Sequence, residues 1–385
     1  MSEFRTIREL CSVVVDCPHS TPKWTANGKI VIRNNNIKHG RIDFSSPSYT
    51  DDEHFAQRIK RAKPQPGDII ITREAPIGDV GMIPENTECC LGQRMVLLRA
   101  NQSVCDNFYL LYSLQSLYVQ HQISWSEGTG TTVSNLRIPH LEQIQIPYLP
   151  LEQQAKISSV LRALEEKIEN NRRLNDNLAD LLQTVYQDRF GNTSLVANQG
   201  FLSDICSYSR DKVAVSELNV STYFSTENML PGKAGSTEAT SLPTTPQTTA
   251  CHKGDTLISN IRPYFKKIVY CEDKCGCSTD VLCFTPSQPQ YSAYLFSTLY
   301  ADKFFAFMVA GSKGTKMPRG DKQQIMTYPV VLPSEAALGN FNVIALPLID
   351  QIYSYRAENK RLSLLRDTLL TKLMSGEIDV SDIQL

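Results

Sequence analysis

The chain has 385 residues, of which 41% are hydrophobic and 21% charged, a composition typical of folded globular proteins and not of disordered chains. Its length is enough for two or three domains that each bury a core of their own. Lysine plus arginine (39) nearly balance aspartate plus glutamate (40), for a formal net charge of -1. Any nucleic-acid-binding surface must therefore be a local basic cluster.

The first stretch of the chain, residues 1–150, is predicted to be a β-rich domain. Residues 67–99 alternate short apolar runs, such as Ile69–Ile71 and Met95–Leu98, with Gly, Pro and Asn. This alternation is typical of short strands joined by turns.

A long helix is predicted at 151–190, because the segment has neither Pro nor Gly and apolar residues recur every three or four positions. Gly191 is expected to end it. A second domain is predicted at 191–345, and a second helix with a tail at 346–385, with Pro347 in the first turn and Gly376 at the end.

The two helices are expected to pack on each other as an antiparallel, coiled-coil-like pair, because each apolar stripe is narrow. Asn171 and Asn359 fall inside the stripes, where they either fix the register of the pair or face water. The residues predicted to form the interface between the helices are Leu161, Leu164, Ile168, Asn171, Leu174, Leu178, Leu181, Ile352, Asn359, Leu362, Leu365 and Leu369.

The chain repeats itself at an offset of nearly half its length. Four features of the first half recur in the same order in the second half. The pairs are Gly67–Ile71 with Gly254–Ile258, Gly130–Thr131 with Gly314–Thr315, Ile146–Pro150 with Tyr328–Pro333, and Asn171–Leu174 with Asn359–Leu362. Two copies of a β-rich domain followed by a helix predict an α+β fold with pseudo-two-fold symmetry.

Three strings and their order resemble the specificity subunits of type I restriction–modification systems. Residues 67–78 with 92–99 resemble the family's target-recognition domain, and residues 130–136 with 146–154 resemble its junction with the central helix. Residues 365–378 resemble the family's C-terminal ending. The second copy departs from the pattern, since Ala336–Gly339 stand where the first helix opens with Glu152-Gln153-Gln154.

The resemblance implies two β-rich target-recognition domains, each binding one half of a bipartite, asymmetric site on double-stranded DNA. It implies that the helices set the gap between the half-sites and bind two methyltransferase subunits, with a restriction/translocase subunit as a further partner. S-adenosylmethionine, ATP and Mg²⁺ would then belong to those partners and not to this chain.

The chain is predicted to be non-catalytic, since it has neither a Gly-x-x-x-x-Gly-Lys-Ser/Thr phosphate loop nor a His-Glu-x-x-His site. Cys271, Cys275, Cys277 and Cys283 lack the paired Cys-x-x-Cys spacing of a zinc site, so no metal is predicted. The 11 cysteines, the lack of a long apolar run and the polar start predict reduced thiols in a cytoplasmic protein.

DNA binding requires cations for phosphates and side chains such as Arg, Asn and Gln for base edges. Structural ion pairs or a solvated surface are equal alternatives for each candidate. The candidates are Arg58, Lys60, Arg61, Lys63, Arg73, Glu74, Gln93, Arg94, Gly130 and Thr131 in the first domain, and Asn260, Arg262, Lys266, Lys267, Lys313, Lys316 and Arg319 in the second.

Three other functions stay open from the sequence. A methylation-only or orphan specificity subunit keeps the fold and the DNA binding but lacks a nuclease partner. A two-headed protein-interaction scaffold without DNA binding would agree with the neutral net charge. A fused restriction–methyltransferase enzyme is disfavoured by the short chain and the missing motifs.

Overall fold

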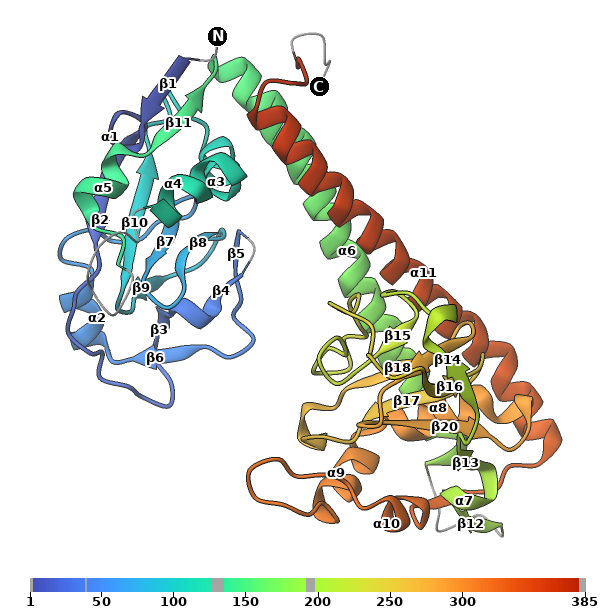
Figure 1. Ribbon diagram of the computed structural model, residues 1–385. Coiled ribbons are helices and arrows are strands. Elements are labelled where there is room, and N and C mark those ends of the chain that lie inside the picture. The colour runs from blue at the N-terminus through green and yellow to red at the C-terminus, as the bar shows by residue number, and fades with distance from the viewer. Residues whose placement is uncertain (1–2, 39, 126–134, 192–197, 381–385) are drawn as a thin grey trace. The chain divides into compact units, whose positions relative to one another are not determined.

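The computed structural model describes residues 3–38, 40–125, 135–191 and 198–380. The chain divides into two compact units (Figure 1): unit 1 comprises Met1–Glu169 and Glu358–Leu385, and unit 2 comprises Asn170–Ala357. Each unit combines a β-rich part with segments of two long helices, α6 (Leu151–Phe190) and α11 (Glu335–Met374). The predicted α+β fold class is confirmed. None of the described helices is both long and apolar enough to span a membrane.

Unit 1 is built on an antiparallel sheet with the strand order β2–β10–β7–β8. Its strands are β2 (Cys11–Asp16), β10 (Met95–Ala100), β7 (Ile69–Arg73) and β8 (Ile77–Met82). A second sheet has the order β6 (Ser48–Thr50), β3 (Lys29–Ile32) and β9 (Cys89–Leu91). The remaining strands form the pairs β1 (Glu3–Thr6) with β11 (Gln145–Tyr148) and β4 (Ile37–Lys38) with β5 (Arg41–Ile42).

The apolar run of β7 is explained by burial on both faces of the sheet. Ile69 and Ile71 pack into the core formed with helices α3 (Asn107–Gln115) and α4 (Leu117–Trp125). Ile70 packs on the opposite face, with Ile32 of the second sheet. A strand covered on both sides has no polar face, so its side chains do not alternate in polarity. The shorter helices of unit 1 are α1 (Ile7–Leu10), α2 (Asp52–Arg58) and α5 (Ile138–Gln143).

Unit 2 repeats this plan with the sheet order β13–β20–β17–β18. Its strands are β13 (Cys206–Tyr208), β20 (Val281–Pro286), β17 (Thr256–Ser259) and β18 (Ile268–Tyr270). A second sheet consists of β14 (Lys212–Ala214), β16 (Gln247–Cys251), β19 (Cys275–Cys277) and β15 (Tyr223–Phe224), and β12 (Gln199–Phe201) pairs with β21 (Pro329–Val331). The helices are α7 (Leu202–Ile205), α8 (Ser292–Tyr300), α9 (Asp302–Ala310) and α10 (Lys322–Met326).

The internal repeat is visible in the turns that precede β7 and β17. Gly67 and Gly254 both have positive φ, 84° and 90°, which glycine adopts without a steric cost. The following residues, Asp68 and Asp255, are both buried, and each carboxylate accepts a hydrogen bond from the backbone N–H three residues earlier. The same turn followed by the same strand order confirms the predicted repeat.

The helix α6 has the bounds predicted from the sequence, whereas α11 begins at Glu335, earlier than the predicted start at residue 346. Ser334 Oγ accepts a hydrogen bond from Ala337 N at 3.3 Å, as an N-terminal capping residue does. Pro347 lies inside the helix instead of in its first turn. Leu338, Phe341 and Ala345 are buried ahead of it, and this packing stabilises the extra turns. The division of the chain into four functional segments stays a prediction.

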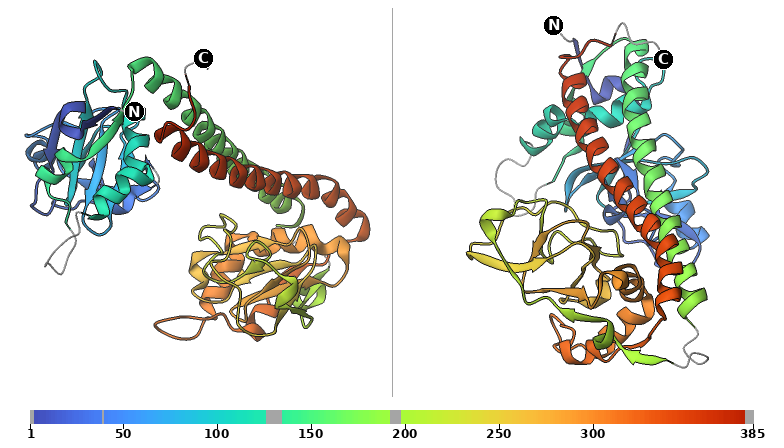
Figure 2. Two further views of the ribbon diagram at one scale, coloured as in Figure 1. Left: turned by 45° about the horizontal axis from the view of Figure 1, so that its top comes forward. Right: turned by 90° about the vertical axis from the view of Figure 1, so that its right-hand side faces the viewer.

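The helices run antiparallel within each unit (Figure 1 and Figure 2). In unit 1, Leu161 of α6 belongs to the same core as Leu373 of α11, and Asn359 Nδ2 donates to the Ile168 carbonyl at 3.2 Å. In unit 2, Leu182 and Phe341 share a core.

The buried face of the helices differs from the predicted one at three leucines. Leu161, Ile168, Asn171 and Ile352 are buried as predicted, and Leu164, Leu178, Asn359, Leu362 and Leu369 are partly buried. Leu174, Leu181 and Leu365 are instead exposed, by 42%, 48% and 46%. Buried residues of α6 follow steps of seven, through Leu161, Ile168, Asn175 and Leu182. Leu174 and Leu181 lie one position off this series, which turns their side chains about 100° around the helix.

Candidate nucleic-acid interface

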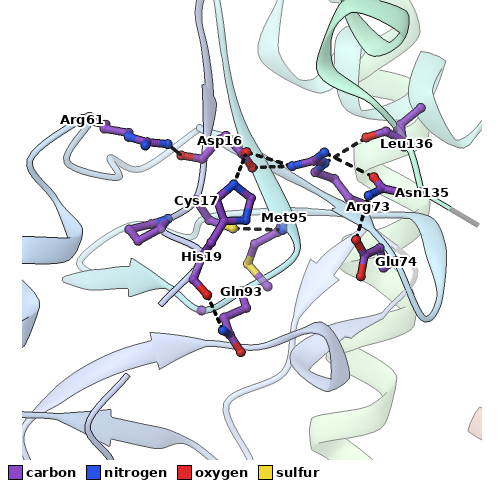
Figure 3. A network of polar contacts seen from close by, with 12 residues as sticks. Asp16, Cys17, His19, Arg61, Arg73, Glu74, Gln93, Met95, Asn135 and Leu136 are labelled. Carbon is purple, nitrogen blue, oxygen red and sulfur yellow. Dashed lines mark hydrogen bonds and ion pairs between the residues drawn. The ribbon is translucent and has the colours of Figure 1, made fainter. Parts of the chain in front are cut away.

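Arg73, at the end of β7, is the centre of a polar network in unit 1 (Figure 3). Its Nη1 donates to both carboxylate oxygens of Asp16 at 2.8 Å, its Nε donates to the Leu136 carbonyl at 2.8 Å, and its Nη2 donates to Asn135 Oδ1 at 3.2 Å. The Arg73 and Asp16 side chains are only 12% and 13% exposed. The guanidinium is therefore used inside the protein, and the structure does not present it to a DNA base as the sequence predicted.

Glu74 and Arg94 form the outer part of this network. Arg94 Nε lies 3.2 Å from Glu74 Oε2, and the Arg94 side chain is 58% exposed. Asn135 Nδ2 donates to Glu74 Oε1 at 2.8 Å, and Asn34 Nδ2 donates to the Glu74 carbonyl at 2.7 Å. These bonds orient Glu74, while Arg94 keeps donors available to solvent.

Arg58 is a structural residue and not a phosphate contact. It is 6% exposed, and its guanidinium donates to the carbonyls of Leu91, Ser20, Pro18 and Gly92 at 2.7–3.1 Å. Burial lowers the pKa of Arg58. The prediction of an accessible cation fails here because α2 turns this side chain inward.

The three other cations predicted beside Arg58 are exposed. Arg61 Nη1 donates to the Asp16 carbonyl at 3.4 Å, which brings it to the edge of the network (Figure 3). Lys63 Nζ lies 3.0 Å from Glu88 Oε1. Lys60 completes this exposed basic turn.

Three residues that the sequence did not single out adjoin this network. His19 is 70% exposed at its side chain, its Nε2 lies 3.0 Å from Asp16 Oδ2, and its carbonyl accepts a hydrogen bond from Gln93 (Figure 3). Trp24 is 46% exposed, and the Arg33 guanidinium lies 5.2 Å from the centre of its ring. Trp24 could have been selected from the sequence, because tryptophan is rare in this chain, which has 2 of them. Gly130 and Thr131 lie outside the described residues.

Unit 2 brings several predicted residues together after β17. Asn260 is 7% exposed, and its side-chain oxygen accepts no hydrogen bond from any residue that the structure describes. The loop that carries the predicted basic residues is attached to this turn, because Arg262 N donates to the Pro318 carbonyl at 2.8 Å and Gly320 N donates to the Asn260 carbonyl at 3.3 Å. Lys313, Lys316 and Arg319 are exposed on that loop.

Two of these cations are paired with carboxylates. Arg319 Nη2 lies 3.0 Å from Asp280 Oδ1, and Lys313 Nζ lies 2.6 Å from Asp321 Oδ2. The hydrogen bond from Lys313 lowers the pKa of Asp321. Both cations nevertheless remain accessible, with side chains 56% and 81% exposed.

Lys266 binds a neighbouring carboxylate, and Lys267 binds a neighbouring backbone carbonyl. Lys266 Nζ lies 3.0 Å from Asp302 Oδ1, a carboxylate shared with Lys233 at 2.7 Å, and these two hydrogen bonds lower the pKa of Asp302. Lys267 Nζ donates to the Thr226 carbonyl at 2.6 Å, and burial lowers its pKa. Lys267 therefore supports the turn from inside, in contrast to the predicted phosphate contact.

The turns after β7 and β17 share an uncommon backbone conformation. Ala75 has a φ of 44° and precedes Pro76, and Arg262 has a φ of 51° and precedes Pro263. These two residues are 187 positions apart, as are Gly67 and Gly254. A residue other than glycine in the left-handed region is strained, and such residues concentrate at functional sites. Both units thus have a strained pre-proline turn at the same place in the repeat.

A family model described as the type I restriction modification DNA specificity domain matches residues 3–179. Residues 3–179 belong to that family. The match covers the β-rich part of unit 1 and most of α6, so the resemblance predicted from the sequence is confirmed.

Similarity to a specificity subunit extends beyond this domain, over most of the chain. The MjaIX specificity subunit of a type I restriction enzyme from Methanocaldococcus jannaschii is 22% identical over 344 residues, which cover 82% of this chain and 79% of that protein. The MjaX specificity subunit from the same organism is 34% identical over 106 residues, and the match spans 24% of its length.

Among solved structures, the S subunit of a type I restriction–modification system from M. genitalium has the same fold. It aligns with a TM-score of 0.59 and 20% sequence identity, over 97% of this chain and 96% of its own. This alignment covers both halves of the chain, so the half that follows the specificity domain also has the fold of that S subunit.

Proposed function

We propose that the chain is a non-catalytic DNA-recognition subunit of a type I restriction–modification complex, which reads one half of a bipartite, asymmetric DNA site with each unit. The observation that supports this best is the pair of equivalent pre-proline turns, each beside exposed cations. A rigid turn can hold side chains against base edges, while the cations around it neutralise phosphates.

In unit 2, we assign phosphate binding to Lys313, Lys316 and Arg319. All three are exposed on one loop that is hydrogen-bonded to the strained turn. Asn260 and Arg262 are the candidates for base recognition, since an amide pairs with adenine and a guanidinium with guanine. The free side-chain oxygen of Asn260 and the buried Arg262 Nε accept and donate no hydrogen bond within the described part of the chain.

In unit 1, we assign base recognition to Arg94 and Gln93, with His19 and the stacked pair Trp24 and Arg33 beside them. Arg94 combines an exposed guanidinium with a positive φ of 64°, and Glu74 holds it in place. Lys60, Arg61 and Lys63 are the proposed phosphate contacts. Arg58 and Arg73 keep the loops of this surface in position.

We assign the gap between the half-sites to the helices. The 40 residues of α6 correspond to about 60 Å of helix, while successive turns of B-DNA lie about 34 Å apart. The exposed leucines Leu174, Leu181 and Leu365 offer apolar surface for two methyltransferase subunits. S-adenosylmethionine, ATP and Mg²⁺ would be bound by the methyltransferase and restriction/translocase partners.

The decisive experiment is co-expression of the chain with the methyltransferase encoded beside it, followed by mapping of methylated adenines in the host DNA by single-molecule sequencing. We expect one bipartite motif, methylated on both strands and absent when this chain is omitted. Methylation that persists unchanged without the chain would refute a recognition role. Failure of the complex to bind DNA with a steep salt dependence would favour a protein-interaction scaffold without DNA binding.

A further inference from the structure

Asp280 occupies in unit 2 the position that Arg94 occupies in unit 1. Each residue directly precedes the second strand of the main sheet, β10 for Arg94 and β20 for Asp280. The Arg94 carbonyl accepts a hydrogen bond from Arg73 N at 2.8 Å, and the Asp280 carbonyl accepts one from Asn260 N, also at 2.8 Å. Arg73 and Asn260 both lie two residues before the strained pre-proline residue of their unit. Asp280 is therefore the counterpart of Arg94 in the repeat.

An ion pair holds both residues at the same place, but the charges are exchanged. Arg94 Nε lies 3.2 Å from Glu74 Oε2, and Asp280 Oδ1 lies 3.0 Å from Arg319 Nη2. Glu74 directly precedes the strained residue of its turn, and its counterpart in unit 2 is Ile261. Arg319 forms an isolated β-bridge with Ile261, so its cation stands beside the position where unit 1 has a carboxylate. From equivalent positions, unit 1 thus presents a guanidinium and unit 2 a carboxylate.

The Asp280 carboxylate is both accessible and oriented. Its side chain is 37% exposed, compared with 58% for Arg94. A carboxylate offers about four lone-pair sites, so the contact with Arg319 leaves sites for a donor from outside the protein. The loop that carries Arg319 is itself attached to the turn, because Gly320 N donates to the Asn260 carbonyl at 3.3 Å. The carboxylate therefore has a defined direction.

A carboxylate beside DNA can be accommodated only where the DNA presents a hydrogen-bond donor. Phosphates repel it because they carry the same charge, and guanine presents the two acceptors N7 and O6 in the major groove. Cytosine presents only the N4 amino donor there, whereas adenine has the acceptor N7 next to its N6 donor. A carboxylate therefore selects cytosine. A guanidinium has the opposite preference, since it donates to both N7 and O6 of guanine.

We propose that Asp280 is a specificity-determining residue of unit 2, which accepts a hydrogen bond from N4 of a cytosine, while Arg94 of unit 1 donates to a guanine in the other half-site. This inference rests on the proposed function and names the base that each residue reads. Arg319 is then a positioning residue for Asp280, as Glu74 is for Arg94, and its remaining donors stay available to a phosphate. The change of sign at one equivalent position gives two units of one fold different half-sites.

The test is the mapping of methylated adenines in cells that co-express the methyltransferase with the full chain carrying Asp280→Asn or Arg94→Gln. Amide side chains pair with adenine through two hydrogen bonds. Asp280→Asn should therefore replace cytosine by adenine at one position of one half-site, and Arg94→Gln should replace guanine by adenine at one position of the other. The preference for the wild-type base should fall about tenfold in each case.

Glu217→Gln is the matched control, because it removes a carboxylate from another exposed ion pair of unit 2. Glu217 Oε2 lies 2.8 Å from Lys274 Nζ, and the two side chains are 55% and 58% exposed. The turn that carries Lys274 lies ahead of β17, whereas Asp280 lies beyond the other end of that strand. We expect this variant to direct methylation to the wild-type motif.

Two results with Asp280→Asn would overturn the inference. An unchanged motif would show that Asp280 reads no base, and weaker methylation of the unaltered motif would show that it only anchors the loop of Arg319. In both cases the proposed function would stand, because methylation would still depend on the chain. Methylation that is independent of the wild-type chain would refute the proposed function itself.

Two further readouts decide the question if Asp280→Asn does not assemble with its partners. A wild-type half-site composed only of A·T pairs would exclude the inference without any variant. The double substitution Asp280→Ala with Arg319→Ala leaves no unpaired charge, and the resulting complex should accept any base at the position of the cytosine. A strict requirement for cytosine in this double variant would overturn the inference.

Discussion

The Nη1 atom of Arg73 donates to both carboxylate oxygens of Asp16, each at a distance of 2.8 Å, with both side chains nearly buried. This ion pair joins the end of β7 to the end of β2, and Arg73 also binds Asn135 and Leu136. The same aspartate contacts His19 and, through its carbonyl, Arg61. One buried pair thus fixes several loops at the edge of the proposed interface.

Replacement of Arg73 should therefore impair folding as well as DNA binding. Arg73→Ala leaves Asp16 as a nearly buried carboxylate without its cation, which typically costs about 3–5 kcal/mol. We expect a clear decrease in the thermal unfolding temperature of the complex, measured by calorimetry. Lys60→Ala, an exposed neighbour, should leave it unchanged. An Arg73→Ala protein of wild-type stability that has lost DNA binding would instead make Arg73 a direct DNA contact.

Replacement of a cation that contacts DNA phosphates should weaken DNA binding without lowering the stability of the fold. Lys316→Ala should weaken binding to all DNA sequences and leave stability unchanged within about 0.5 kcal/mol. The slope of log affinity against log salt should fall by about 0.9 for the lost phosphate contact. Fluorescence anisotropy of labelled DNA over a salt series measures both quantities.

Lys274→Ala is the matched control for this experiment. Lys274 is an exposed lysine of the same unit, 58% exposed at its side chain and paired with Glu217, but it lies outside the proposed surface. An equal change in salt slope for Lys274→Ala and Lys316→Ala would mean that the loop of residues 313–319 has no special role.

The sequence predicted the fold well because its signals are local and repeated. The apolar run Ile69–Ile71 forms strand β7, and the Gly-Asp pairs at 67 and 254 form turns, as predicted. The exposure of individual side chains was harder to predict, because the direction of a side chain depends on tertiary contacts. Arg58 and Lys60 look alike in the sequence, yet one is 6% exposed and bound to four carbonyls while the other faces solvent. The sequence did not predict His19, because Gln93, which donates to the His19 carbonyl, is 74 residues away in the sequence and reaches it only in the folded chain.

In the helices, too, tertiary contacts decide which side chains are buried, and two adjacent leucines of α6 allow a direct test. Leu182 is 1% exposed and Leu181 is 48% exposed, although they are adjacent leucines of the same helix, α6. Leu182→Ala should destabilise the chain by about 2–5 kcal/mol, because it leaves a cavity in the core. Leu181→Ala should change stability by about 0.5 kcal/mol or less. Denaturant unfolding of the two variants compares them directly.

Leu181→Ala also tests the proposed role of the exposed leucines. If methyltransferase subunits bind there, this variant should retain its stability but elute without its partner in size-exclusion chromatography. Equal destabilisation by the two substitutions would contradict the seven-residue burial pattern. Wild-type assembly of Leu181→Ala would place the partner elsewhere on the chain.

Shortening both helices by seven residues should change the gap in the methylated motif and leave both half-sites unaltered. Deletion of Glu169–Asn175 from α6 and Ser354–Lys360 from α11 shortens the pair by about 10 Å, or roughly three base pairs of B-DNA. Seven residues turn a helix by nearly two full turns, so the buried face shifts by only about 20°. A three-residue deletion at the same points is the control, because it rotates the buried face by about 60° and should prevent folding. Adenine mapping reads out the result, and altered bases within a half-site would show that the helices do not act as a spacer.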